Sequence, residues 1–158
     1  MAVLLGGRLR QVGPAADVFA APVDEEVAAF VGVENIVQGR LQSLADGLAT
    51  IDVGGVTIQA MAPSLDSGGE VLVCLRPEDV VLGPARLDSH TTSARNHLRG
   101  TVRRITMIGG PVRVLLDCGF TLVALITKQS LEEMGLAVGD EVVASFKATA
   151  VHVIPRGT

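Results

Sequence analysis

Asn-Ile-Val-Gln-Gly at residues 35–39 returns as Asn-His-Leu-Arg-Gly at residues 96–100, and the repeat extends well beyond these five residues. The other shared positions are strand valines and a late basic residue: Glu70, Val71, Val73, Arg76, Val80 and Leu82 in the first copy, matched by Glu141, Val142, Ser145 or Ala144, Lys147, Val151 and Val153 in the second. Since both copies keep these residues in one order, the repeat predicts two related β-modules in tandem.

Each copy contains five short apolar runs separated by turn residues such as Asp-Gly and Gly-Gly, a pattern typical of strands. The predicted strands of the first copy are 36–41, 48–53, 56–61, 71–75 and 80–82. Those of the second are 98–107, 112–117, 121–126, 142–146 and 151–154. Five strands at this spacing predict a small Greek-key barrel of the OB type, so the fold class is mainly all-β with two OB-like barrels.

Residues 1–34, here called the N-terminal segment, precede the first copy and follow a different pattern. Gly6-Gly7 between apolar runs predicts a tight hairpin. Two short helices are expected next, one opened by Pro14 and one capped by Asp24, with Val27, Phe30 and Val31 as the buried stripe of the second. The predicted boundaries are therefore 1–34 for this segment, 35–84 for the first module, 85–92 for a polar linker and 93–155 for the second module.

The second copy contains an insertion that the first lacks. Ser130-Leu131-Glu132-Glu133-Met134-Gly135 has the spacing of a capping box, with Gly135 as a left-handed stop. We expect a one-turn helix between the third and fourth strands of the second module.

Charge is distributed unevenly along the 158 residues. Residues 1–92 carry 5 basic and 12 acidic groups, a net charge of −7, and residues 93–158 carry 8 and 5, a net charge of +3. A local basic excess attracts small anions to the second module, although such asymmetry also arises without function. The chain has no Trp, no Tyr and four Phe, whereas OB proteins that bind single-stranded nucleic acid stack bases on aromatic side chains. A nucleic-acid partner is not expected.

The two cysteines lie one in each copy, Cys74 within the predicted strand 71–75 and Cys118 directly after the predicted strand 112–117, without the spacing of a metal site. Cys74 and Cys118 are therefore expected as reduced core thiols, and no metal site is predicted. No apolar run is long enough for a membrane span, and Met1 to Leu5 lacks the layout of a signal peptide. We expect a cytoplasmic location without direct membrane insertion.

The most specific four residues are Ser93-Ala94-Arg95-Asn96, directly before the second copy. Arg95 offers a planar fork of donors and Ser93 a hydroxyl at a strand entrance, a combination that suits an oxyanion. Lys147, where the last two strands meet, is the second candidate. The structural alternatives are a turn made by Ser93 and Asn96 with Arg95 paired to an acid, and a salt bridge shared by Lys147 and its counterpart Arg76.

No constellation for catalysis is present in the sequence. Arg76-Pro77-Glu78-Asp79 contains two carboxylates but has no nucleophile or metal ligand beside it, and a solvated turn explains it. The sequence contains neither a phosphate loop nor a Gly-x-Ser-x-Gly elbow. We predict that the chain is not an enzyme.

These residues resemble a known family. The segment 93–154 is similar to the Mop-like version of the transport-associated OB (TOBE) domain of molybdate and tungstate proteins, through Ser93-Ala94-Arg95-Asn96, Ile126-Thr127, Ser130, Leu136, Gly139-Asp140 and Lys147-Ala148. The first copy resembles the TOBE domain of ABC importer ATPases, and the N-terminal segment resembles the tail of such an ATPase domain. The resemblance thus implies the C-terminal regulatory region of a molybdate/tungstate-type ABC transporter ATP-binding subunit, without its nucleotide-binding motifs.

The resemblance also implies a site and an assembly. Carried over by position, the oxyanion-binding residues are Ser93, Ala94, Arg95, Asn96, Lys147 and Ala148, with molybdate or tungstate as ligand and no cofactor. Family members pair across two subunits, so a homodimer is implied, with membrane subunits contacted through the ATPase domain. In the first copy Val33-Glu34-Asn35 stands in place of Ala94-Arg95-Asn96, so an equivalent second site is not expected.

The leading hypothesis is a non-catalytic regulatory domain that senses molybdate or tungstate at a dimer interface. The alternative is a structural dimerisation module of an ABC transporter ATPase that binds no ligand.

Overall fold

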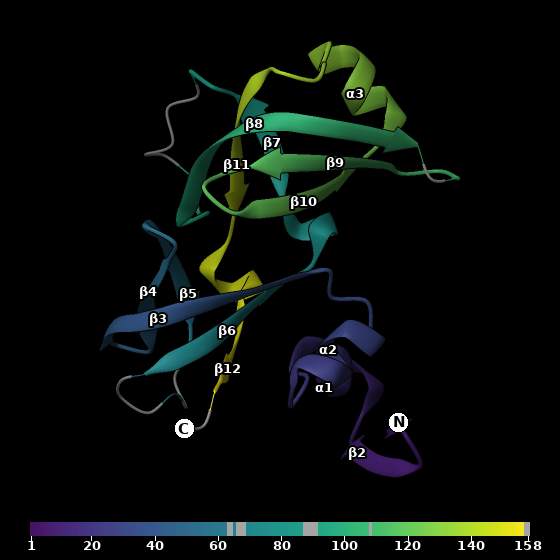
Figure 1. The fold of residues 1–158 in the computed structure, drawn as a ribbon, viewed down its shortest axis with the longest axis vertical. Helices are drawn as coiled ribbons and strands as arrows, with labels where there is room; N and C mark the ends of the chain where they lie inside the picture. Colours follow the sequence, from purple (N-terminus) through teal and green to yellow (C-terminus); the bar gives the residue numbers. More distant parts are fainter. Residues whose placement is uncertain (63–64, 66–68, 87–91, 108, 157–158) are drawn as a thin grey trace.

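The computed structural model describes residues 1–62, 65, 69–86, 92–107 and 109–156. Two five-stranded antiparallel sheets lie one above the other, and a small layer made by the N-terminal segment lies beside the lower one (Figure 1). Most of the predicted linker 85–92 falls outside the described residues.

The first sheet, here called the first barrel, has the order β12-β6-β3-β4-β5. Its strands are His152–Pro155 (β12), Glu70–Leu75 (β6), Asn35–Ala45 (β3), Leu48–Val53 (β4) and Val56–Met61 (β5). The second barrel has the order β10-β9-β8-β11-β7, with strands Thr121–Ile126 (β10), Val112–Asp117 (β9), Asn96–Met107 (β8), Glu141–Phe146 (β11) and Val81–Pro84 (β7). All ten predicted strands are present, and β3 extends to Ala45, beyond its predicted end.

The last strand of each copy joins the barrel of the other copy. After β6 the chain passes through the 3-10 turn η1 (Pro77–Asp79) and enters the second barrel, where β7 pairs with β11. After β11 it passes through the 3-10 turn η2 (Ala148–Ala150) and returns, so that β12 pairs with β6. The sheets therefore do not follow the predicted boundaries 35–84 and 93–155: β7 completes the second barrel and β12 the first.

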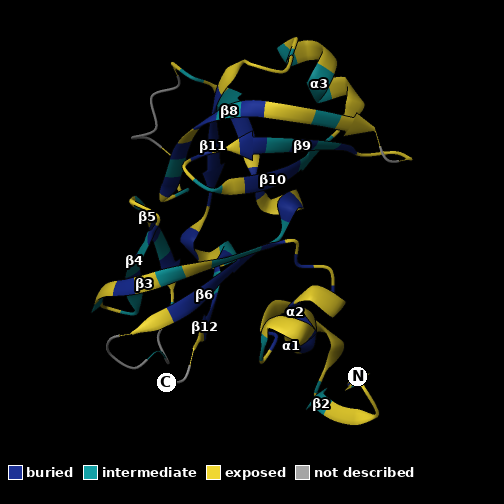
Figure 2. Ribbon diagram, viewed as in Figure 1, coloured by how far each residue is buried: buried dark blue, intermediate teal, exposed yellow. Residues whose placement is uncertain are grey.

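This exchange gives the two barrels one continuous core. Buried apolar residues from both copies pack in a single cluster, among them Ile51, Ile58, Leu116, Leu122 and Phe146. The dark strands of Figure 2 show this burial in both barrels. Removal of this apolar surface from water is the main term that stabilises the fold. The core is shared, so a single barrel would leave part of this surface exposed to water.

Two buried asparagines join the barrels through reciprocal hydrogen bonds. The side chain of Asn35 donates to the carbonyl of Val123 and accepts from its N–H, both at 2.8 Å. Asn96 makes the same two bonds with Gln59, also at 2.8 Å. Since Val123 lies on the edge strand β10 and Gln59 on the edge strand β5, each asparagine satisfies a peptide group that the sheet leaves open.

The N-terminal segment forms a separate apolar cluster against the outer face of β6 and β12. The hairpin β1 (Ala2–Leu5) and β2 (Arg8–Val12) and the helices α1 (Ala15–Ala20) and α2 (Glu25–Phe30) are present as predicted. Asp24 caps α2 by accepting from the Val27 N–H at 2.9 Å. The cluster joins Val3, Val18, Val27, Ala28, Val31 and Val33 to Leu72, Cys74 and Ile154.

The prediction that Phe30 is buried was wrong, because its side chain is 59% exposed. Each residue advances about 100° around a helix, so Phe30 points away from the direction shared by Val27, Ala28 and Val31.

The insertion of the second copy forms α3 (Lys128–Met134). The prediction that Ser130 caps this helix was wrong. The N-cap is Thr127, whose hydroxyl accepts from the Ser130 N–H at 3.0 Å, so the helix begins before Ser130. A threonine hydroxyl, like that of serine, can accept from a free N–H of the first turn. Gly135 ends the helix in the left-handed conformation, with φ of 58°, as predicted.

We predict that Asn35→Ala lowers the free energy of unfolding by about 2–4 kcal/mol, because two buried peptide groups of Val123 lose their partners. Urea denaturation measures this loss. Wild type and variant should each unfold in one transition, since the core is continuous. The control is Gln38→Ala, at an exposed position of the same strand. A loss no greater than that of the control would contradict the bridging role of Asn35.

A second prediction concerns Gly100, where an added Cβ would lie 2.6 Å from the Cys118 sulfur. Gly100→Ala should destabilise the chain by about 1–3 kcal/mol through overpacking. The same substitution should cost less in a Cys118→Ala background, because the sulfur is then absent. Thermal unfolding of the four proteins measures this coupling, and additive effects would refute the clash.

Candidate functional site

The two segments of the predicted oxyanion site meet at one end of the second barrel. The antiparallel register sets Asn96 at the start of β8 opposite Phe146 at the end of β11. Arg95, which precedes β8, and Lys147, which follows β11, therefore flank the same end of the sheet. Both are exposed, as is Ser93. The fold thus brings two positive charges and a hydroxyl to one surface where water and solutes have access.

Asn96 anchors this segment rather than presenting a free amide at the surface. Its side chain is 2% exposed, and its amide donates to and accepts from the backbone of Gln59. Because Gln59 belongs to the first barrel, the segment before β8 is fastened to both barrels.

Ala94 is also held by a side chain that sequence reasoning missed. The His97 ring lies with Nε2 2.8 Å from the Ala94 carbonyl oxygen and Nδ1 2.9 Å from the Ser145 hydroxyl. His97 and Ser145 are opposite one another in the β8–β11 register. The signal was available in the repeat, since the first copy has Ile36 and Cys74 at these positions, and a paired change from apolar to polar indicates a new contact.

Lys147 and Ala148 begin the turn η2. Lys147 is its N-cap and makes no side-chain capping hydrogen bond, while its carbonyl accepts from the Ala150 N–H at 3.0 Å. Ala148 is 4% exposed, so any contact from it to a ligand comes from the backbone. The Lys147 side chain is exposed, at the end of β11 that pairs with the start of β8.

The equivalent positions of the first copy are used for internal contacts. Glu34, at the position of Arg95, accepts from Arg113 of β9, with Nε 3.1 Å away. Arg76, at the position of Lys147, donates to the carbonyls of Val31 at 3.0 Å and Phe19 at 2.7 Å. Its guanidinium also lies 5.7 Å from the centre of the Phe19 ring, a cation–π distance. Arg76 therefore fastens the N-terminal segment to the first barrel.

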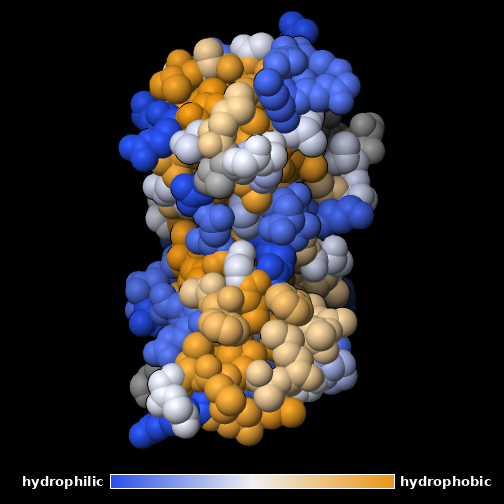
Figure 3. Space-filling model, turned by 90° about the vertical axis from the view of Figure 1, so that its right-hand side faces the viewer, coloured by the Kyte–Doolittle hydropathy of each residue, from blue (hydrophilic) through white to orange (hydrophobic). Residues whose placement is uncertain are grey.

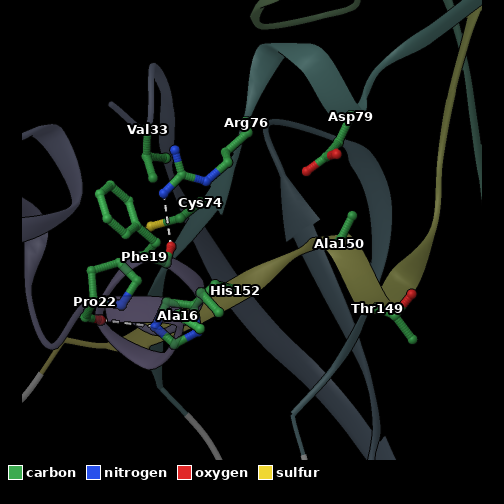
Figure 4. Close-up of a pocket in the computed structure, with 11 residues that line it drawn as sticks. Ala16, Phe19, Pro22, Val33, Cys74, Arg76, Asp79, Thr149, Ala150 and His152 are labelled. Carbon is green, nitrogen blue, oxygen red and sulfur yellow. Dashed lines mark hydrogen bonds between the residues drawn. The ribbon is translucent and has the colours of Figure 1, made fainter. Parts of the chain in front are cut away.

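A cavity of about 310 Å³ lies beside this contact, between α1 and the turns of the first barrel (Figure 4). Arg76, Phe19 and Cys74 lie on one side of it, with Asp79, Ala150 and Thr149 across from them. Partial burial raises the pKa of Asp79, and the charge of Glu78 adds to this rise while Arg76 opposes it. The cavity contains none of the predicted oxyanion residues.

The two carboxylates and the two cysteines considered as candidates occupy positions that suit a structural role. Glu78 and Asp79 are exposed in the turn η1, as the prediction of a solvated turn requires. Cys74 and Cys118 are free and buried. Burial raises the thiol pKa of Cys74 to about 12 and that of Cys118 to about 11, which keeps both protonated and unreactive at neutral pH.

Two kinds of feature are absent from the described part of the chain. These residues contain no group of three or more His, Cys, Asp or Glu side chains placed to hold a metal ion. Their helices are also all too short or too polar to cross a bilayer.

Comparison with known proteins identifies the class. A TOBE domain model matches residues 92–153, the part of the chain that contains the candidate site. The solved structure of the cytoplasmic molybdate-binding protein ModG, with molybdate bound, is similar with a TM-score of 0.66 and 28% identity, over 78% of this chain and 97% of that one. The chain thus contains a TOBE domain within a fold of two OB-like barrels, as the sequence predicted.

Two curated relatives indicate which group of proteins with a TOBE domain this chain resembles. The chain is 42% identical to a molybdate/tungstate import ATP-binding protein of Pyrococcus horikoshii, over 97% of this chain and 41% of the relative. It is 31% identical to a spermidine/putrescine import ATP-binding protein of Thermobifida fusca, over 98% of this chain and 40% of the relative. These matches confirm the resemblance to the C-terminal regulatory region of such ATP-binding subunits. The chain spans about two fifths of the length of these relatives. The two relatives are named for the import of different substances, so a ligand for this chain has to be argued from its own site.

We predict that Arg76→Met loosens the N-terminal segment without unfolding the barrels, because two hydrogen bonds to carbonyls and a cation–π contact are lost. Hydrogen exchange should show weaker protection of α1 and α2, by about tenfold or more. The control is Arg40→Met, an exposed side chain 4.0 Å from Glu70. Unchanged protection of both helices in Arg76→Met would contradict the fastening role.

Proposed function

We propose that the chain binds molybdate or tungstate at the Ser93–Asn96 segment and Lys147–Ala148, as the non-catalytic regulatory region of an ABC importer ATP-binding subunit. The observation that carries this proposal is the β8–β11 register, which puts Arg95 and Lys147 at one exposed end of the sheet. Two positive charges match a tetrahedral dianion, and Ser93 and backbone N–H groups at the strand entrance would supply hydrogen bonds.

The first barrel is not proposed as a second site of this kind. A carboxylate, Glu34, stands where Arg95 stands in the second barrel, and it repels a dianion. The cation at the Lys147 position, Arg76, is already bound to the carbonyls of Phe19 and Val31. The proposed stoichiometry is therefore one oxyanion site for each chain.

A symmetric homodimer is the proposed binding form. In a single chain Ser93, Arg95 and Lys147 face water, and charge interactions between exposed groups and a hydrated anion are weak. A second subunit that covers this surface excludes water and strengthens each contact. Oxyanion and dimer then stabilise one another, which is the coupling that a sensor requires.

The N-terminal segment is proposed to be the tail of the ATPase domain. Several of its large apolar side chains are exposed: Met1, Leu4, Leu9, Val12, Phe19, Val23 and Phe30. Figure 3 shows the apolar surface gathered over the lower part of the molecule, where this segment lies. A contiguous apolar surface is typical of a protein interface. Through the ATPase domain the parent protein would contact membrane subunits from the cytoplasmic side.

The relatives support this proposal in part. Molybdate and tungstate appear in the names of the import proteins that are 42% identical to this chain, and ModG binds molybdate. The polyamine importer shares the region at lower identity, so membership in this group of relatives does not by itself fix the ligand.

The test is calorimetric titration with molybdate. Wild-type chain should release or absorb heat with saturation, and Arg95→Ala or Lys147→Ala should each weaken the affinity by about 10-fold to 100-fold, the worth of one charged hydrogen bond. Lys128→Ala is the matched control, because it removes the same charge from α3. Its affinity should stay within about twofold of wild type.

The alternative is the dimerisation module without a ligand. Absence of heat and of a thermal shift with molybdate and with tungstate, together with a dimer whose elution is independent of both, would replace the sensing proposal by that alternative.

A further inference from the structure

The His97–Ser145 pair contacts the backbone of the predicted oxyanion segment and has an apolar equivalent in the other barrel. His97 lies on β8 and Ser145 on β11, directly opposite in register. Ser145 is 9% exposed and His97 is partly buried, so both contacts are shielded from water. Hydrogen bonds in such a place are stronger and more directional than those at an open surface.

The partners determine which nitrogen of His97 carries the proton. A carbonyl oxygen only accepts, so Nε2 must donate to Ala94. In the neutral ring Nδ1 is then an acceptor, and the hydroxyl of Ser145 donates to it. The three groups form one directed chain of hydrogen bonds from β11 through β8 to the backbone before the strand. The Thr92 hydroxyl reaches the same carbonyl only at 3.5 Å and from an exposed position, so His97 is the stronger restraint.

Holding the Ala94 carbonyl also orients the next amide. The carbonyl of Ala94 and the N–H of Arg95 belong to one planar trans peptide, and they point in opposite directions. Because the Ala94 carbonyl points to the His97 ring, the Arg95 N–H points away from that ring. The same restraint fixes the starting direction of the Arg95 side chain.

The first barrel provides an internal comparison. Ile36 and Cys74 occupy the same cross-strand pair on β3 and β6. They pack with the apolar cluster of the N-terminal segment, and the stretch before β3 carries Glu34 in place of Arg95. The polar pair therefore occurs in the barrel that has the basic segment, and the apolar pair in the barrel that lacks it.

We propose that His97 and Ser145 are positioning residues that hold the Ala94–Arg95 peptide with its N–H directed at the oxyanion. This inference rests on the proposed function and deepens it, since it adds the Arg95 backbone N–H to the ligand contacts. Neither His97 nor Ser145 touches the ligand.

The test replaces His97 and Ser145 by the residues that the first barrel has at the same positions, Ile36 and Cys74. His97→Ile with Ser145→Cys copies a combination that packs at the same register in the first barrel, so the double variant should fold. We expect its molybdate affinity to fall by about tenfold and hydrogen exchange at the amides of residues 94–96 to accelerate, while the remainder of β8 stays protected. His97→Gln keeps a side-chain donor near the Ala94 carbonyl and should recover most of the affinity.

Nuclear magnetic resonance of the His97 ring gives a readout that needs no ligand. The neutral ring should carry its proton on Nε2 in the wild type. A ring protonated on Nδ1 alone would overturn the positioning role.

The outcomes separate the two proposals. Loss of molybdate binding in Arg95→Ala with unchanged affinity and unchanged amide protection in the double variant would overturn the positioning role and leave the proposed function standing. A wild-type chain that binds neither molybdate nor tungstate would overturn both. Reduced affinity with restored binding in His97→Gln supports the inference.

Discussion

The exchange of last strands between the barrels is the constraint on which the rest of the structure depends. β7 and β12 each close a sheet whose other strands come from the other copy, so neither copy can complete its barrel alone. The reciprocal bonds of Asn35 and Asn96 join the two barrels and satisfy the edge strands β10 and β5. A buried asparagine without such partners would be costly, and these bonds therefore select this one arrangement of the barrels.

The same crossing places the candidate site. The chain leaves the second barrel at Lys147 on its way to the first, and the segment that enters β8 is fastened to Gln59 of the first barrel. Oxyanion binding at Ser93, Arg95 and Lys147 would thus act on a junction between barrels rather than on an isolated loop. Contacts that bridge two packed units are the places where a small ligand can bias their arrangement.

The two copies show how one scaffold takes two roles through local substitution. Where the second copy has Arg95 and Lys147 facing water, the first has Glu34 and Arg76 engaged with neighbours. Arg76 joins the first barrel to the N-terminal segment, whereas Lys147 is exposed. The first copy thereby attaches the N-terminal segment, and the second copy would be the one that recognises the proposed oxyanion. The strand valines and glycines that build the barrels are shared by both copies.

The sequence by itself determined the strands, the turns, the cap of α2, and the segments of the candidate site, because these depend on alternation and on residues close along the chain. It did not determine which sheet β7 and β12 join, because a strand alternates identically whichever partner it has. The exposure of Phe30, the Thr127 cap and the contact from His97 to Ala94 were also found only in the folded chain. Each depends on what lies across a sheet or around a helix, and tertiary packing alone decides that.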